Sequence, residues 1–132
     1  MFVDASAVVA IIVREPEFEG LVEKLEAAAK RFTSPLAKYE AVLAINRILS
    51  PPSLQATQAV VDRLFDLYEI RTVDISPEVG VEAIGAFDQF GKGRHEARLN
   101  MGDCFSYACA KLLKVPLLCK GNDFIQTDIK IA

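Results

Sequence analysis

The chain has 132 residues and a formal net charge of −3. This length allows one sizeable hydrophobic core but not two ordinary ones. The charge gives no overall attraction to nucleic acid, so a nucleic-acid role needs a local basic patch or a bound cation. Hydrophobic residues make up 52% of the chain and charged residues 25%, as in a globular protein. No repeat, low-complexity tract or long linker interrupts the sequence, and we expect a single domain over residues 1–132.

Strand and helix patterns alternate from the N-terminus. Residues 1–4 predict a short buried strand, and Ser6 is a plausible N-cap for the apolar helical turn that follows. Hydrophobic spacing then predicts a helix over residues 15–32 and a short extended segment at residues 32–34.

Two further helices are predicted on either side of Pro51-Pro52, because this pair ends the first of them. The second covers residues 53–68 and has Ser53 as its N-cap. The first covers residues 35–49, and its apolar positions include Leu36, Tyr39, Val42, Leu43 and Ile45.

The C-terminal half continues the alternation. Its predicted elements are a strand at 70–75, a helix at 76–90 capped by Ser76, a basic loop at 91–100, a helix at 101–114, a strand at 115–120, a turn at 121–124 and a possible last strand at 127–132. Alternating strands and helices indicate an α/β protein, with a parallel sheet covered by helices on both faces. In such a sheet the functional site lies outside the carboxyl ends of the strands.

Four acidic residues stand among apolar or small neighbours rather than in a solvated run of charges: Asp4, Glu40, Asp103 and Asp123. Taken singly, Asp103 is explained by a helix N-terminus and Glu40 by a half-exposed helix face. If the four converge on one crevice, they repel one another unless a cation lies between them. Oxygen ligands suit Mg²⁺ or Mn²⁺, and such an ion activates water and stabilises charge on a phosphoryl group.

Four blocks of the sequence carry a resemblance: VDASAVVAII, YEA, LNMGDCFSYACAK and LLCKGNDFIQTDI. In order and spacing they resemble a PIN-domain ribonuclease, specifically a VapC-type toxin of a toxin–antitoxin pair, over essentially the whole chain. The resemblance implies a three-layer α/β/α fold with a central parallel sheet, and cleavage of RNA with Mg²⁺ or Mn²⁺. It also implies a homodimer and an antitoxin protein that blocks the site.

The resemblance assigns roles to particular residues. It makes Asp4 and Asp103 the principal metal ligands, adds Glu40 to the acidic cluster and places Ser6 beside the site. The fourth acid stays open, because the family often has a longer acidic run where this chain has KGNDF. Either Asp123 completes the cluster, or it orients the loop while Asn122 faces the site.

The basic loop before Asp103 is the other candidate for contact with RNA. We expect Arg94 and Arg98 to contact phosphate groups of the substrate, the alternative being an ordinary solvated loop. We expect Asn100 to cap the following helix, and His95 to be a surface residue rather than a general base. The chain has no Trp, and its sequence has no stacking-platform signature of the kind that single-strand binders show. We expect four phenylalanines in the core: Phe18, Phe65, Phe87 and Phe105.

The apolar N-terminal run does not have the pattern of a secretion signal, because it lacks a basic start, contains Asp4 and leads directly into charged residues. Nothing approaches the ~20 apolar residues of a membrane span. Three cysteines without a CxxC pair predict free thiols, typical of a reducing compartment. We therefore expect a cytoplasmic protein without membrane association.

These observations favour a metal-dependent endoribonuclease that acts as a toxin and hydrolyses RNA phosphodiester bonds. Two alternatives remain: a non-toxic PIN-type nuclease, working in RNA processing or on DNA, and an inactive protein-binding module of the same fold. The retained acids argue against the inactive module, since a degenerate site has no reason to keep carboxylates that repel one another.

Overall fold

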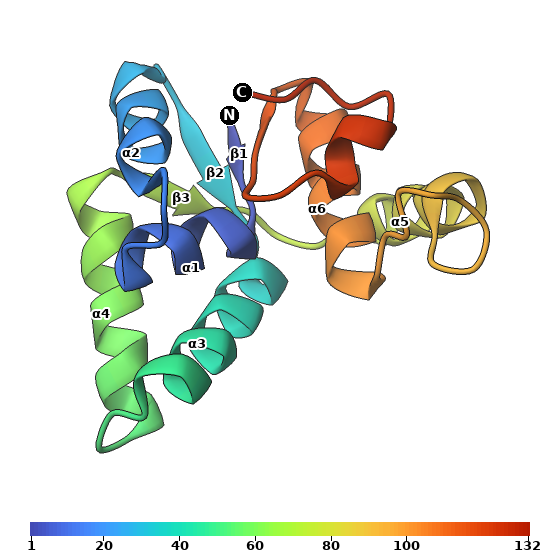
Figure 1. The fold of residues 1–132 in the computed structure, drawn as a ribbon. Helices are drawn as coiled ribbons and strands as arrows, with labels where there is room; N and C mark the ends of the chain where they lie inside the picture. The colour runs from blue at the N-terminus through green and yellow to red at the C-terminus, as the bar shows by residue number, and fades with distance from the viewer.

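A computed structural model describes residues 1–132. Its centre is a sheet of four parallel strands in the order β3-β2-β1-β4 (Figure 1). The strands are β1 (Phe2–Val3), β2 (Arg31–Thr33), β3 (Ile70–Thr72) and β4 (Leu117–Leu118). The helices are α1 (Ala5–Val13), α2 (Phe18–Ala27), α3 (Pro35–Leu49), α4 (Leu54–Leu67), α5 (Pro77–Phe90) and α6 (Met101–Leu113), with a short 3-10 helix η1 (Asp123–Gln126).

Helices cover both faces of the sheet, which confirms the predicted three-layer α/β/α fold. In Figure 1, α1 to α4 lie on one side of the strands, and α5, α6 and the C-terminal segment lie on the other. Successive strand residues point to opposite faces: Phe2 belongs to the core under α5 and α6, whereas Val3 belongs to the core under α1 to α4. Leu117 and Leu118 divide between the two cores in the same way.

The strands predicted at 70–75 and 115–120 are shorter, as β3 and β4, and two other predicted elements differ more. The helix predicted over residues 15–32 is only α2, because Arg31 belongs to β2 and donates hydrogen bonds to the carbonyl groups of Leu25, Glu26 and Tyr68. The last strand predicted at 127–132 is reduced to an isolated bridge between Leu117 and Ile131. The caps predicted at Ser53 and Ser76 are confirmed.

The predicted apolar face of α3 is only partly buried. Ile45 is buried as expected, but the closest packing is made by the small residues Ala37 and Ala41. Tyr39 and Leu43 are 60% and 40% exposed. Because α3 packs through its alanines, its larger side chains face outward beside the carboxyl end of β1.

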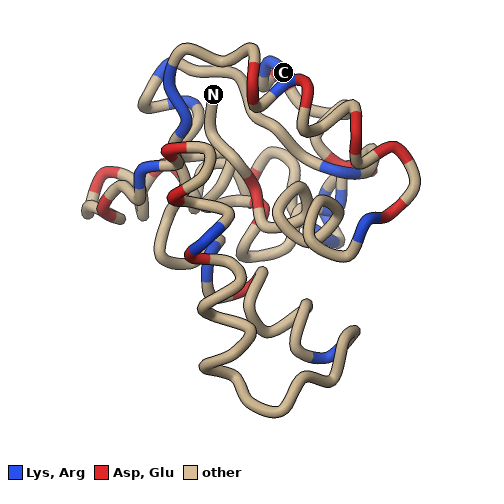
Figure 2. Tube along the Cα trace, turned by 90° about the vertical axis from the view of Figure 1, so that its left-hand side faces the viewer, with Lys and Arg blue, Asp and Glu red and all other residues tan.

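The predicted phenylalanine core is also mixed. Phe65 is buried and Phe18 and Phe105 are partly buried, whereas Phe87 is 42% exposed on α5. Figure 2 shows acidic and basic residues interspersed along the trace rather than gathered into one basic stripe. No helix is both long enough and apolar enough to cross a membrane.

Candidate active site

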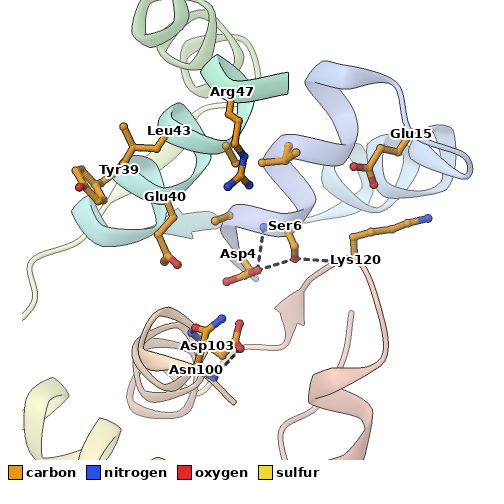
Figure 3. Close-up of a pocket in the computed structure, with 13 residues that line it drawn as sticks. Asp4, Ser6, Glu15, Tyr39, Glu40, Leu43, Arg47, Asn100, Asp103 and Lys120 are labelled. Atoms are coloured by element: carbon orange, nitrogen blue, oxygen red, sulfur yellow. Dashed lines mark hydrogen bonds between the residues drawn. The ribbon is translucent and has the colours of Figure 1, made fainter. Parts of the chain in front are cut away.

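A pocket of about 490 Å³ lies at the carboxyl end of β1, between α1, α3 and the N-terminus of α6 (Figure 3). The pocket lies at the topological switch point of the sheet, because β2 and β4 lie on opposite sides of β1. This is the expected position of a site in an open parallel sheet. Three of the four predicted acids line it: Asp4, Glu40 and Asp103.

Asp4 connects the sheet to α1. Its backbone N–H donates to the carbonyl of Leu118 in β4, and its side chain caps α1 by accepting a hydrogen bond of 2.9 Å from the N–H of Ser6. The prediction that Ser6 is the cap is therefore wrong, since the helix begins at Ala5 and leaves Asp4 as the extended residue before it. The side chain of Asp4 is almost fully buried, with 3% exposed.

Ser6 instead links three parts of the site. Its hydroxyl donates to the Asp4 carboxylate at 2.6 Å and accepts from the N–H of Lys120, in the loop after β4, at 3.0 Å. The ammonium of Lys120 turns outward to the carbonyl of Pro16 and to Glu17. Ser6 thus holds Oδ2 of Asp4 in place, and the other carboxylate oxygen stays free on the pocket side.

Asp103 is held by a capping box at the start of α6. The N–H of Asn100 donates to Oδ2 of Asp103, and the N–H of Asp103 donates to Oδ1 of Asn100, both at 2.9 Å. The prediction that Asn100 caps this helix is confirmed. The box occupies one carboxylate oxygen of Asp103 and fixes the direction of the other.

Glu40 comes from the middle of α3 and is held differently. It takes part in none of the four ion pairs of the chain, and its carboxylate lies where a Cβ atom on Gly102 would stand. Gly102 is buried in the first turn of α6. Only a glycine at this position lets the carboxylate approach the start of α6 so closely.

Burial and neighbouring carboxylates disfavour the charged forms of Glu40 and Asp103. Burial, with smaller contributions from the charges of Asp4 and Asp103, raises the pKa of Glu40 to about 7. The pKa of Asp103 is raised to about 6: burial is the main cause, the charges of Asp4 and Asp123 add to it, and the hydrogen bond from Asn100 opposes it. The repulsion expected from the sequence is therefore present in the structure.

The other predicted site residues lie outside this pocket. Asp123 is exposed at the start of η1, and only its charge reaches Asp103. Asn122 lines a separate depression that includes Lys24 and Ile125. The structure therefore does not bring Asn122 together with the three acids.

The basic loop forms a depression of its own, lined by Lys92, Arg94, His95 and Arg98 among others. Arg94 pairs with Asp88 at 2.9 Å, and its guanidinium lies over the ring of Phe87. The imidazole of His95 accepts a hydrogen bond from the N–H of Ala97 and packs edge-on against Phe90. These contacts hold the loop together and place none of its side chains among the acids.

Three residues beside the acids were not predicted from the sequence to belong to the site: Tyr39, Arg47 and Gly102. Tyr39 and Arg47 line the pocket from α3. Arg47 follows Glu40 by seven residues, two helical turns, so the spacing could have shown that they share a face. Gly102 could have been noticed because it lies in a predicted helix, where glycine is less favourable than alanine by about 1 kcal/mol.

The donor set suits a hard divalent cation. It consists of carboxylate oxygens alone, and Asp4, Glu40 and Asp103 each keep at least one oxygen free of the hydrogen bonds described above. No three His, Cys, Asp or Glu side chains lie close enough together to enclose an ion. This arrangement fits Mg²⁺ or Mn²⁺, which retain several waters and use only one or two carboxylates directly.

The raised pKa values predict that the metal-free protein loses stability as the pH rises. A carboxyl group with a raised pKa binds its proton more tightly in the folded state, so its contribution is complete below about pH 4 and is lost as the pH passes through about 6 for Asp103 and about 7 for Glu40. We expect the melting temperature in EDTA to fall over this interval. Thermal denaturation of Glu40→Gln should show a smaller fall, and an equal fall in both proteins would contradict the assignment.

Comparison with known proteins identifies the family of the chain. The family model described as "PIN domain" matches residues 1–130. A VapC ribonuclease of Rhizobium meliloti is 39% identical, covering 97% of this chain and 98% of that protein. Ribonuclease VapC42 of Mycobacterium tuberculosis is 38% identical, covering 100% of this chain and 98% of that protein.

Solved structures show the same fold at lower identity. VapC20 of Mycobacterium tuberculosis, described as a toxin that cleaves the sarcin-ricin loop, superposes with a TM-score of 0.74 at 16% identity, covering 99% of this chain and 97% of that one. A toxin–antitoxin complex from Klebsiella pneumoniae superposes with a TM-score of 0.69 at 14% identity, covering 99% and 95%. With the family match and the full-length relatives, the chain belongs to the PIN-domain family, among its VapC-type members.

Proposed function

We propose that the protein is a Mg²⁺- or Mn²⁺-dependent endoribonuclease that acts as the toxin of a toxin–antitoxin pair. The observation that carries the proposal is the convergence of Asp4, Glu40 and Asp103, from three different elements, on one pocket at the carboxyl end of β1. The full-length relatives named ribonucleases support it. Three carboxylates that oppose one another's charge are hard to explain as a purely structural feature.

In this proposal Asp4 and Asp103 hold the ion, and their partners keep them in place. When bound, the ion activates water and stabilises charge on the phosphoryl group. Ser6 and the Asn100 capping box fix the two ligand carboxylates before substrate arrives, so little reorganisation is needed during the reaction. Glu40 has the least constrained carboxylate and a pKa raised to about 7, and it is placed to accept the proton of the attacking water.

The outlying residues have supporting roles in the proposal. Asp123 adds its charge to the acidic cluster. Arg94 and Arg98 contact phosphate groups of RNA farther from the cut. The three cysteines are free, which agrees with a cytoplasmic protein. A cognate antitoxin is proposed because one of the structurally similar chains comes from a toxin–antitoxin complex.

Removal of the metal tests the reaction. We expect the purified protein to cleave total cellular RNA with Mg²⁺ or Mn²⁺ and to lose all cleavage in EDTA, because the carboxylates alone cannot stabilise charge on phosphate. Mapping the new RNA ends, in cells that express the protein without a partner, would identify the target and test toxicity. Cleavage that persists in EDTA rules out the metal mechanism; cleavage without growth arrest favours the non-toxic nuclease.

A homodimer is the second part of the proposal, and the face between α5 and α6 supports it. Val81, Ile84 and Met101 are 72%, 73% and 65% exposed there, beside a groove lined by no charged residue. An uncharged apolar face can pair with a second copy of itself without placing like charges opposite one another.

Ile84→Glu should therefore convert a dimer to a monomer in light scattering after size-exclusion chromatography, because it would bury a charge at the interface. Leu67→Glu is the matched control, since Leu67 is 73% exposed on α4 and should not affect the dimer. A protein that is monomeric before substitution, or a dimer that survives Ile84→Glu, contradicts this interface.

A further inference from the structure

The pocket extends beyond the three acids along α3. Tyr39 and Leu43 form its outer edge, and Arg47 extends into it from two turns farther along the same helix (Figure 3). Tyr39 and Arg47 stand about 12 Å apart along the helix axis. Glu40 lies between them in the sequence. One helix therefore places an aromatic ring and a cation on either side of a catalytic candidate.

Arg47 is a cation with unused donors. Two basic residues line the pocket, and Lys120 is already engaged with Pro16 and Glu17. Arg47 takes part in none of the four ion pairs of the chain. A guanidinium has five N–H donors in a planar fork that matches the oxygens of a phosphate group.

Tyr39 is an exposed aromatic residue that contributes little to the hydrophobic core. It directly precedes Glu40 and is 60% exposed, whereas the neighbouring Ala37 and Ala41 make the buried contacts of α3. An exposed ring and an unpaired cation on the rim of one pocket form a combination that can hold single-stranded nucleic acid, because every unpaired base has a face that can stack. A base within a duplex is already stacked and cannot reach such a ring.

We infer that Tyr39 and Arg47 are substrate contacts of this pocket: one unpaired base of the RNA stacks on Tyr39, and Arg47 holds a phosphate next to the cut. The inference rests on the proposed function and adds two substrate-contacting residues to it. It also assigns substrate contacts to the rim of the acidic pocket itself, nearer the acids than the basic loop that holds Arg94 and Arg98.

The test is RNA binding by a form of the protein that does not cut. In an Asp4→Asn background, fluorescence anisotropy compares a short mixed-sequence single-stranded RNA with the same RNA annealed to its complement. We expect clear preference for the single strand. Tyr39→Ala should weaken binding of the single strand roughly 10-fold or more, and Tyr39→Phe should restore it, because stacking needs the ring and not the hydroxyl.

Arg47 is tested by the salt dependence of the same binding. Arg47→Ala should lower the slope of log affinity against log salt by about 0.7, the value for loss of one phosphate contact to a single strand. Arg47→Lys should keep most of the slope, and Arg63→Ala, an exposed arginine on α4 outside the pocket, should leave it unchanged.

Several results would overturn the inference. Equal affinity for single strand and duplex, or unchanged binding in Tyr39→Ala and Arg47→Ala, shows that the rim does not hold RNA. If Tyr39→Ala and Arg47→Ala leave RNA binding unchanged but the variants no longer co-purify with a co-expressed antitoxin, the rim binds protein instead. Cleavage by the unsubstituted protein is measured separately, so failure of the nuclease proposal is distinguished from failure of this one.

Discussion

Asp4→Asn and Asp103→Asn should each lower the rate of metal-dependent RNA cleavage by about 10³-fold or more. Each change removes a negative ligand from the proposed ion, and loss of about 4 kcal/mol of transition-state stabilisation corresponds to that factor. Asparagine is the informative substitution at both positions, because its carbonyl oxygen can still accept the hydrogen bond from Ser6 or Asn100. The measurement is the initial rate of cleavage of a labelled RNA over a range of Mn²⁺ concentrations.

The fold should survive both changes. Removing one carboxylate from a cluster with mutual repulsion lowers the cost of bringing the others together, so the melting temperature in EDTA should stay the same or rise. Added Mn²⁺ should stabilise the unsubstituted protein and stabilise the variants much less, since a ligand raises stability only when it binds the folded state. Asp88→Asn, which breaks an exposed pair with Arg94, is the matched control and should cut RNA normally. Full cleavage by either site variant would refute the assignment of the ligands.

Gly102→Ala should be the most damaging change that substitutes no charged or polar residue of the site. The added Cβ would occupy the position of the Glu40 carboxylate, so Glu40 or the first turn of α6 must move. Displacement of a catalytic group by about 1 Å costs on the order of 100-fold in rate, and overpacking costs about 1–3 kcal/mol in stability. Cleavage kinetics and urea unfolding of the same preparation measure the two effects.

Two comparisons isolate the cause. Gly85→Ala, in α5, adds the same atom to a helix where it meets nothing, and should stabilise the protein by about 0.5–1 kcal/mol. In a Glu40→Ala background the overlap is gone, so Gly102→Ala should no longer destabilise. If Gly102→Ala destabilises equally with and without the Glu40 carboxylate, the glycine is needed for another reason.

The architecture and the acids of the site could be predicted from local sequence. Alternating strand and helix patterns indicate a parallel sheet, because each strand must be covered on two faces, and β1 fulfils this with Phe2 and Val3 in different cores. Asp4, Glu40 and Asp103 were identifiable as charges in apolar surroundings, where an unpaired carboxylate is costly. Residues that carry such a cost stand out in a sequence before any contact is known.

The tertiary structure decided the contacts that depend on packing between distant segments. Asp4 rather than Ser6 caps α1, Asn122 lines a different depression from the acids, and Tyr39 is exposed at the edge of the pocket instead of buried in the core. A glycine is required at position 102 only because α3 packs Glu40 against it. Hydrophobic periodicity shows which residues share a face of one helix. Which faces come together depends on how the elements pack, and that is determined by the whole chain at once.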